Sequence, residues 1–172
     1  AQRRLTAARV VTPAWSGVAG VVSRTSSASR RRRERGACAE LSCASFEPLM
    51  TIALTDETTP EDIRAARAAG AVAGKLYPRG VTTNSDSGVC DPLALGPVYA
   101  AMADVGMVLC LHGESTDADA TVLDAEERFL DVFSAIVDRH QDLRVVFEHI
   151  SSGAALERIW GMPTTRVAAT IT

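Results

Sequence analysis

Three residues that could bind a metal ion follow short apolar runs of the chain at equal spacing. Lys75 ends the run VAGK, His112 ends MVLCLH and His149 ends VVFEH, so that both separations are 37 residues. Two neutral imidazoles and an anionic oxygen form a good ligand set for zinc. A lysine can supply that oxygen if its amine reacts with carbon dioxide to give a carbamate, which can bridge two cations. The three residues therefore predict a metal centre, provided that the fold brings them together.

Each of these residues also has a simpler interpretation. A single histidine at the end of a strand is commonly a hydrogen-bonded residue of the core. Lys75 is the only lysine of the chain, and a buried ammonium group must be paired, neutral or modified. A neighbouring carboxylate such as Glu114 or Glu148 could pair with it. Spacing alone leaves the metal centre and the separate structural roles both open.

The elements that must position these residues alternate between strands and helices. Apolar runs predict strands at 49–54, 72–76, 107–111, 143–147 and 166–171. Thr59 and Pro60 predict the start of a helix that Gly70 ends, and Asp91-Pro92 predicts a second helix to about Asp104. A long helix is expected from Asp124, and a short one from Ser151 or Ser152 to about Trp160. The long helix has an apolar stripe that should face the core: Phe129, Val132, Phe133, Ile136 and Val137.

This order of elements predicts an α/β fold with a parallel sheet covered on both faces. An open doubly wound sheet and part of a (β/α)8 TIM-type barrel both fit. No glycine-rich phosphate loop follows a strand, and ionisable residues recur at the carboxyl ends of strands, where barrels place their chemistry. A partial barrel of about five parallel strands is therefore the preferred prediction. Since a barrel needs eight strands, about three are expected to lie outside this sequence.

The first 45 residues differ in composition from the remainder. They contain nine arginines and two acidic residues, whereas residues 46–172 have nine basic and nineteen acidic residues. Three interpretations of residues 1–45 stay open: a transit peptide, a disordered extension or translation of an incomplete gene model, and a basic nucleic-acid or nuclear-import patch. The first two are favoured, so no nucleic-acid partner is expected. A cytoplasmic location is expected, or a mitochondrial or plastid one if the leader is a transit peptide.

The sequence argues against two further classes of protein, membrane-spanning proteins and zinc ribbons. No apolar run approaches the roughly 18 residues that a membrane-spanning helix requires, so no membrane partner is expected. The four cysteines form no paired CxxC pattern, which argues against a zinc ribbon. Cys110 lies within an apolar run and is interpreted as a small core residue.

Several motifs together resemble a known family. The segments PLMTIALTDETTPE, AGKLYPRGVTTNSDSGV, MVLCLHGESTDADATVLDAEERFL, VVFEHISS and RVAATIT resemble, in order and spacing, dihydroorotases of the homodimeric bacterial and plant type. These enzymes belong to the amidohydrolase superfamily. The similarity is seen from Phe46 to Thr172, about three-quarters of the chain. It implies a (β/α)8 barrel with two zinc ions that interconverts dihydroorotate and N-carbamoyl-L-aspartate in pyrimidine biosynthesis.

The resemblance also implies roles for individual residues. Lys75 resembles the carboxylated lysine that bridges the two zinc ions, and His112 and His149 resemble the ligands of the second zinc ion. His112 also lies beside the substrate in the family. Thr82 and Thr83 resemble the threonines of a loop that closes over the substrate carboxylate, although Thr-Thr-Asn-Ser is also ordinary turn composition. Tyr77 is expected to pack behind the site, and His140 to lie at the surface near the end of a helix.

Other residues of the family pattern have no counterpart here. The His-x-His pair of the first strand, the upstream Arg and Asn that hold the substrate, and the aspartate of the last strand are not found. We therefore expect this chain alone to be a poor or inactive catalyst. Two alternatives are a catalytically inactive binding or scaffold module and an amidohydrolase for another cyclic amide; the TTNS loop favours dihydroorotate over the latter.

Overall fold

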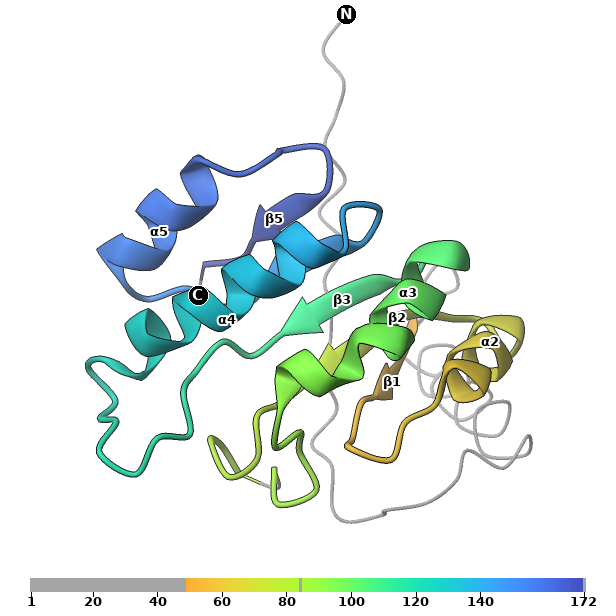
Figure 1. The fold of residues 1–172 in the computed structure, drawn as a ribbon, viewed down its shortest axis with the longest axis horizontal. Coiled ribbons are helices and arrows are strands. Elements are labelled where there is room, and N and C mark those ends of the chain that lie inside the picture. The colour runs from red at the N-terminus through yellow and green to blue at the C-terminus, as the bar shows by residue number, and fades with distance from the viewer. Residues whose placement is uncertain (1–48, 84, 172) are drawn as a thin grey trace, which may run out of the picture.

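The computed structural model describes residues 49–83 and 85–171, which fold as alternating strands and helices (Figure 1). The predictions for the basic leader, and the predicted boundary at residue 46, lie outside the described residues. In chain order the elements are β1 (Met50–Ala53), α2 (Pro60–Ala68), β2 (Ala71–Leu76), the 3-10 helix η1 (Pro92–Leu95), α3 (Gly96–Asp104), β3 (Val108–Leu111), α4 (Ala125–Arg139), β4 (Arg144–Phe147), α5 (Gly153–Trp160) and β5 (Val167–Ala169).

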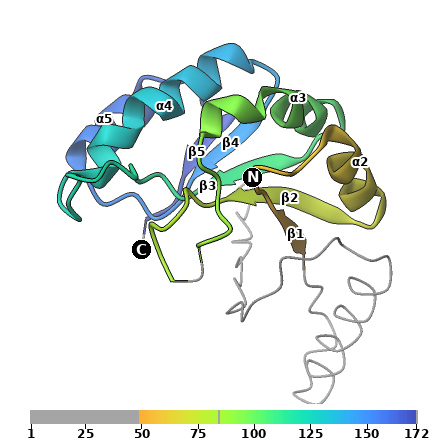
Figure 2. The same ribbon diagram turned by 60° about the horizontal axis from the view of Figure 1, so that its bottom comes forward.

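The five strands form one parallel sheet whose spatial order is the sequence order, β1-β2-β3-β4-β5. The helices α2 to α5 all lie along one face of this curved sheet (Figure 2). A doubly wound sheet reverses its strand order and has helices on both faces. Sequential order with helices on one side is instead the arrangement in an arc of a (β/α)8 barrel. The preferred fold is confirmed, and within the described residues the helices cover one of the two sheet faces that were expected to be covered.

The strand register separates a helix-covered face from an open one. Leu76, Leu111 and Phe147 are paired across β2, β3 and β4, and all three are fully buried beneath the helices. The helices contribute Ile63 and Phe133 to the same core. Because neighbouring residues of a strand point to opposite faces, the other row of the sheet faces away from this core. That row consists of Ala53, Lys75, Cys110, Val146 and Ala168.

Local signals in the sequence determine where the helices begin. Thr59 caps α2 through a reciprocal pair of hydrogen bonds with Asp62, and Pro60 occupies the first turn. Ser152 caps α5 by accepting a hydrogen bond from the Ala155 N–H. Both predicted starts are confirmed. The carboxyl end of α2 is followed by Gly70, which has a φ of 91° and so adopts a backbone conformation suited to glycine.

One predicted helix is divided in two. The single helix expected from Asp91 to about Asp104 is a 3-10 helix followed by α3. Pro97 explains the division, because proline has no N–H to donate to the carbonyl of Leu93 and its ring crowds that carbonyl. The helix therefore restarts with Pro97 in its first turn. The strands also differ by a few residues from their predicted bounds; the fifth is Val167–Ala169 rather than 166–171.

No described helix is both long and apolar enough to cross a membrane.

Candidate metal centre

Lys75 lies at the carboxyl end of β2 and is 7% exposed. Its backbone carbonyl accepts a hydrogen bond from the Leu54 N–H, which fixes the strand end against β1. The ammonium group pairs with the carboxylate of Glu148, which lies just beyond β4. Burial of an unpaired charge would be costly, so this pair accounts for the burial of Lys75. Of the two carboxylates considered from the sequence, Glu148 is therefore the partner.

His112 lies just beyond β3, where its N–H donates a hydrogen bond to the carbonyl of Leu76 at 3.0 Å. Its ring centroid is 4.5 Å from that of His149 and 5.6 Å from that of Tyr77. Burial, together with the nearby His149 and Lys75 side chains, lowers the pKa of His112 to about 4. At neutral pH the imidazole is uncharged, which is the form that binds metal ions.

The Nε2 atom of His112 is buried and has no hydrogen-bond partner. The Oε1 atom of Glu114 lies 3.2 Å away, but the two atoms do not form a hydrogen bond. Buried polar atoms in proteins are nearly always paired. A buried, neutral imidazole nitrogen without a partner fits a metal ligand.

His149 lies two residues beyond β4 and has a φ of 46°, the left-handed region that non-glycine residues seldom adopt. Its N–H donates to the Thr170 hydroxyl at 2.7 Å. The carboxyl ends of β2, β3 and β4 thus bring Lys75, His112 and His149 to one edge of the sheet. Unusual backbone angles of this kind persist when the surrounding structure holds them, often at functional sites.

Two further side chains lie beside the three predicted residues. The Lys75 Nζ atom is 4.6 Å from the centre of the Tyr77 ring, and burial raises the pKa of Tyr77. Cys110 is registered against Lys75, and burial together with the negative charge of Glu148 raises its thiol pKa to about 11. Cys110 is buried, as predicted, but it lies on the Lys75 face and outside the apolar core cluster. A protonated thiol there is a poor nucleophile.

Thr82 and Thr83 are exposed in the loop after β2. The carbonyl of Thr82 accepts a hydrogen bond from the Ser85 hydroxyl at 2.6 Å, and the Thr82 N–H donates to the same hydroxyl at 3.0 Å. Within the described residues, neither threonine side chain hydrogen-bonds to Lys75 or to the two histidines. The structure therefore supports a turn at these residues and does not bring them to the metal centre.

Other parts of the described chain offer no competing metal site. No group of three or more His, Cys, Asp and Glu side chains in residues 49–83 and 85–171 is arranged to hold a metal ion. The candidate centre combines two histidines with a lysine and is not such a group. His140, predicted at the surface, is half-buried at the end of α4, where its ring meets Tyr99 edge-on at 5.4 Å. Burial lowers the pKa of His140.

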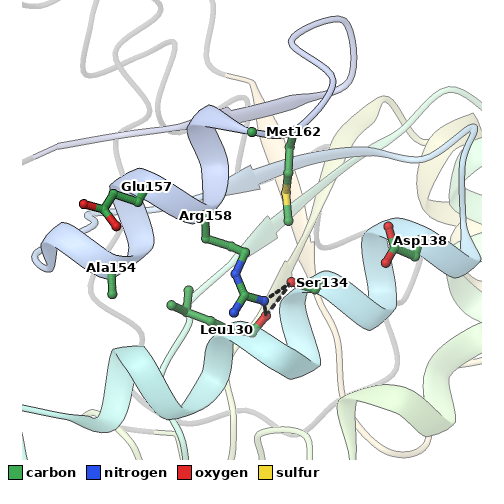
Figure 3. A pocket seen from close by; sticks show the side chains of 8 residues that line it. Leu130, Ser134, Asp138, Ala154, Glu157, Arg158 and Met162 are labelled. Carbon is green, nitrogen blue, oxygen red and sulfur yellow. Dashed lines mark hydrogen bonds between the residues drawn. The ribbon is translucent and has the colours of Figure 1, made fainter.

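One surface groove of the molecule is lined by none of the predicted site residues. It has a volume of about 700 Å³, lies between α4 and α5, and is lined by Leu130, Ser134, Asp138, Ala154, Glu157, Arg158, Gly161 and Met162. Arg158 extends across it to the Ser134 hydroxyl at 2.6 Å and to the Leu130 carbonyl (Figure 3). These contacts join two helices, and the groove contains none of the predicted site residues.

Glu126, in the first turn of α4, is a buried carboxylate that the sequence analysis did not single out. It is 9% exposed and accepts hydrogen bonds from Ser151 and Ser152, in the loop that follows His149. The sequence contains a signal for it. Glu126 precedes Phe129 by three residues and Phe133 by seven, so it lies on the apolar stripe of α4. An acidic residue in that stripe must have buried hydrogen-bond donors.

Comparison with known proteins gives consistent results. No protein-family model matches the chain. A dihydroorotase of Pseudomonas syringae is 49% identical over 142 residues, which is 81% of this chain and 41% of that protein. Dihydroorotase structures from Saccharomyces cerevisiae, in complex with 5-fluoroorotic acid, and from Campylobacter jejuni each cover 84% of this chain. Their TM-scores are 0.70 and 0.69, their identities are 32% and 29%, and the chain covers 44% and 41% of them.

The sequential parallel sheet, with its helices on one face, identifies the chain as part of a (β/α)8 barrel of the amidohydrolase type. Its homologues are dihydroorotases, and the chain spans about two fifths of the length of the curated relative that it matches. The matched share of 81% exceeds the three-quarters of the chain expected from the motifs. The similarity therefore extends upstream of Phe46 into part of residues 1–45.

Proposed function

We propose that this chain forms part of a zinc-dependent hydrolase that acts on a cyclic amide C–N bond. The proposed reaction is the reversible conversion of dihydroorotate and water into N-carbamoyl-L-aspartate, a step of pyrimidine biosynthesis. One observation supports it most: Lys75 lies beside two imidazole rings that are 4.5 Å apart at the carboxyl edge of the sheet. The names of the homologous proteins support the choice of substrate.

The residues present fit such a centre. His112 and His149 would hold one zinc ion, because His112 is neutral and its Nε2 atom is unpaired. Lys75 would supply an oxygen ligand for two ions after its amine adds to carbon dioxide, forming an N–C bond and releasing a proton. Because the paired Lys75 is an ammonium ion, it would first lose another proton, so that two protons leave in all and the pair with Glu148 is replaced by an anionic carbamate. Zinc, when bound, would polarise the amide carbonyl and lower the pKa of a water molecule.

Other residues would have supporting roles. Glu114, whose Oε1 atom lies 3.2 Å from His112 Nε2, would give up that contact when the nitrogen binds zinc, and Glu148 is close enough to Lys75 to steer its amine. Thr82 and Thr83 would bind the substrate carboxylate after their loop moves towards the site. His112 would also contact the substrate. Assembly as a homodimer, and a cytoplasmic, mitochondrial or plastid location, are parts of the same proposal.

Activity of the 172-residue chain tests this proposal. The decrease of dihydroorotate would be followed with and without added zinc for the wild type, His112→Asn, His149→Asn and the control His140→Asn. We expect slow turnover, below that of complete enzymes, that requires zinc and is lost in the first two variants only. His140 is a suitable control because it is a half-buried histidine of the same chain, next to Tyr99.

The alternative is a binding module without catalytic activity. It gains support from the small number of candidate ligands among the described residues, two histidines and one lysine. Under this alternative the folded chain binds zinc through His112 and His149 but gives no zinc-dependent turnover. The same assay therefore separates the two functions.

A further inference from the structure

We propose that Glu126 is a positioning residue that sets the orientation of His149. Its carboxylate lies beneath the loop that connects His149 to α5. The Oε2 atom accepts hydrogen bonds from the Ser151 N–H at 2.9 Å and from the Ser151 hydroxyl at 3.1 Å. The Oε1 atom accepts one from the Ser152 N–H at 2.8 Å. Both carboxylate oxygens are thus used, which explains how the charge is tolerated in a residue that is 9% exposed.

These bonds complete an unbroken series of anchors around His149. The N–H of Glu148 donates to the Leu111 carbonyl at 3.0 Å. The N–H groups of His149 and Ile150 donate to the hydroxyl and the carbonyl of Thr170, at 2.7 and 2.9 Å. The next two N–H groups donate to Glu126. The five consecutive N–H groups of residues 148–152 therefore all donate to other parts of the chain. Their acceptors lie in β3, in the residue that follows β5, and in α4.

This series explains how His149 keeps its unusual backbone. At a φ of 46° a histidine is strained, so the conformation requires support on both sides. Thr170 holds the peptide before and the peptide after His149. Glu126 fixes the two peptides that follow, and its negative charge lies at the start of α5, where a helix favours an anion. Without Glu126, the N–H groups of Ser151 and Ser152 would lose their acceptor and the loop would shift.

The first turn of α4 also holds the loop that follows His112. The carbonyl of Ala125, the residue before Glu126, accepts a hydrogen bond from the Ser115 N–H at 2.8 Å. One helical turn therefore contacts both histidine loops. Through Glu126 it would determine where the His149 ring lies relative to that of His112. The consequence for metal binding depends on the proposed function, whereas the effect on the His149 ring does not.

Histidine ring signals of the full chain test the proposal directly. The chain has three histidines, so ¹H–¹³C correlation spectra of ¹³C-histidine-labelled protein resolve three rings, assigned with single His→Gln variants. Glu126→Ala should move or broaden the His149 signal and leave that of His140 in place. Glu126→Gln should have a smaller effect, because one of its two terminal atoms still accepts a hydrogen bond. Glu127→Ala, which alters an exposed neighbour, should move no ring signal.

Each outcome has a definite meaning. An unchanged His149 signal in folded Glu126→Ala would overturn the proposal, as would equal shifts of His149 and His140, which indicate a general loss of structure. If Glu126→Ala does not fold, the same criteria apply to Glu126→Gln, which has the shape of glutamate. Hydrogen exchange of the Ser151 and Ser152 amides should accelerate in both variants and stay unchanged in Glu127→Ala.

A second measurement separates this proposal from the proposed function. Titration with cobalt(II), a spectroscopic substitute for zinc, should show about tenfold weaker binding and altered visible bands in Glu126→Ala, as for other residues that orient metal ligands. If wild-type protein binds no cobalt, the metal function fails, but the ring signals still decide the role of Glu126. If wild type and Glu126→Ala bind cobalt equally with identical bands, the positioning role is wrong and the metal function stands.

Discussion

At the scale of single residues, burial determines the charge of the candidate site. His112 has a side chain that is 12% exposed, and burial lowers its pKa to about 4. The same burial keeps Lys75 paired with Glu148. The site thus combines a neutral imidazole with an ammonium group whose charge is balanced by a carboxylate. Under the proposed function, a zinc ion would bind the imidazole nitrogens and carbon dioxide would add to the Lys75 nitrogen.

The lowered pKa of His112 predicts how stability depends on pH. Between about pH 6.5 and 4 the unfolded chain binds a proton at His112 and the folded chain does not, so acid favours unfolding. The stabilisation is complete above pH 6.5 and is lost as the pH falls towards 4. From pH 7 to 4.5, we expect His112 to account for about 2 to 3 kcal/mol of lost unfolding free energy.

Urea unfolding in the presence of a chelator measures this contribution. Wild-type protein and His112→Gln would be compared at pH 7 and pH 4.5. The wild type should lose more stability than the variant, by the amount attributed to His112. An identical loss in both proteins would mean that the buried imidazole protonates in the folded state as readily as in the unfolded chain.

The sequence predicted the positions of these residues in the fold better than it predicted their contacts. Apolar runs ending in Lys75, His112 and His149 were sufficient to place them at strand ends, because side chains at those ends share one edge of a parallel sheet. The choice of Glu148 over Glu114 as the partner of Lys75 depends on which strand end lies nearer, and spacing does not determine it. Glu126 was missed because its donors, Ser151 and Ser152, follow it by about 25 residues.

At the scale of elements, the turn after β3 depends on a glycine. A methyl group added at Gly113 would overlap the ring of Phe147, which is fully buried and packs edge-on against Phe133 at 4.9 Å. We expect Gly113→Ala to cost about 1 to 3 kcal/mol of unfolding free energy, as overpacking of a core does. The control is Gly153→Ala, where an added carbon meets nothing within 4 Å. Thermal unfolding should show a lower midpoint for the first variant only, and equal midpoints would contradict the packing of Gly113 on Phe147.

The start of α2 provides a second prediction. Thr59→Ala removes the hydroxyl that accepts the Asp62 N–H and so breaks the capping box. We expect a loss of about 1 kcal/mol in unfolding free energy. Thr164→Ala, at an exposed threonine in the turn before β5, serves as the matched control and should stay within about 0.5 kcal/mol of the wild type. A stable Thr59→Ala variant would show that packing alone holds α2.

The boundaries of the helices show which features of the fold a sequence pattern can predict. Capping residues placed the starts of α2 and α5 correctly because a cap acts through hydrogen bonds within a few residues. The division between η1 and α3 was not predicted, although Pro97 is visible in the sequence. Proline is accepted in the first turn of a helix and excluded from its interior. The apolar pattern of residues 91–104 did not show whether Pro97 begins a new helix or lies inside a longer one.

At the scale of the whole molecule, strand order decides the architecture. The sequence left a barrel arc and a doubly wound sheet both possible, since each alternates strands with helices. The order β1 to β5 and the single helical layer settle the choice. The same arrangement explains why Lys75 and Cys110 lie on the face opposite the helices, the face that is the interior in a (β/α)8 barrel.

We propose that side chains from three strand ends bind one metal centre. X-ray absorption of the zinc-loaded chain tests it most directly, because imidazole ligands give characteristic scattering. We expect nitrogen ligands at about 2.0–2.1 Å with the scattering of two imidazoles, reduced in His112→Asn and in His149→Asn and unchanged in His140→Asn. Zinc bound without imidazole scattering, or with a spectrum that neither substitution alters, would contradict it.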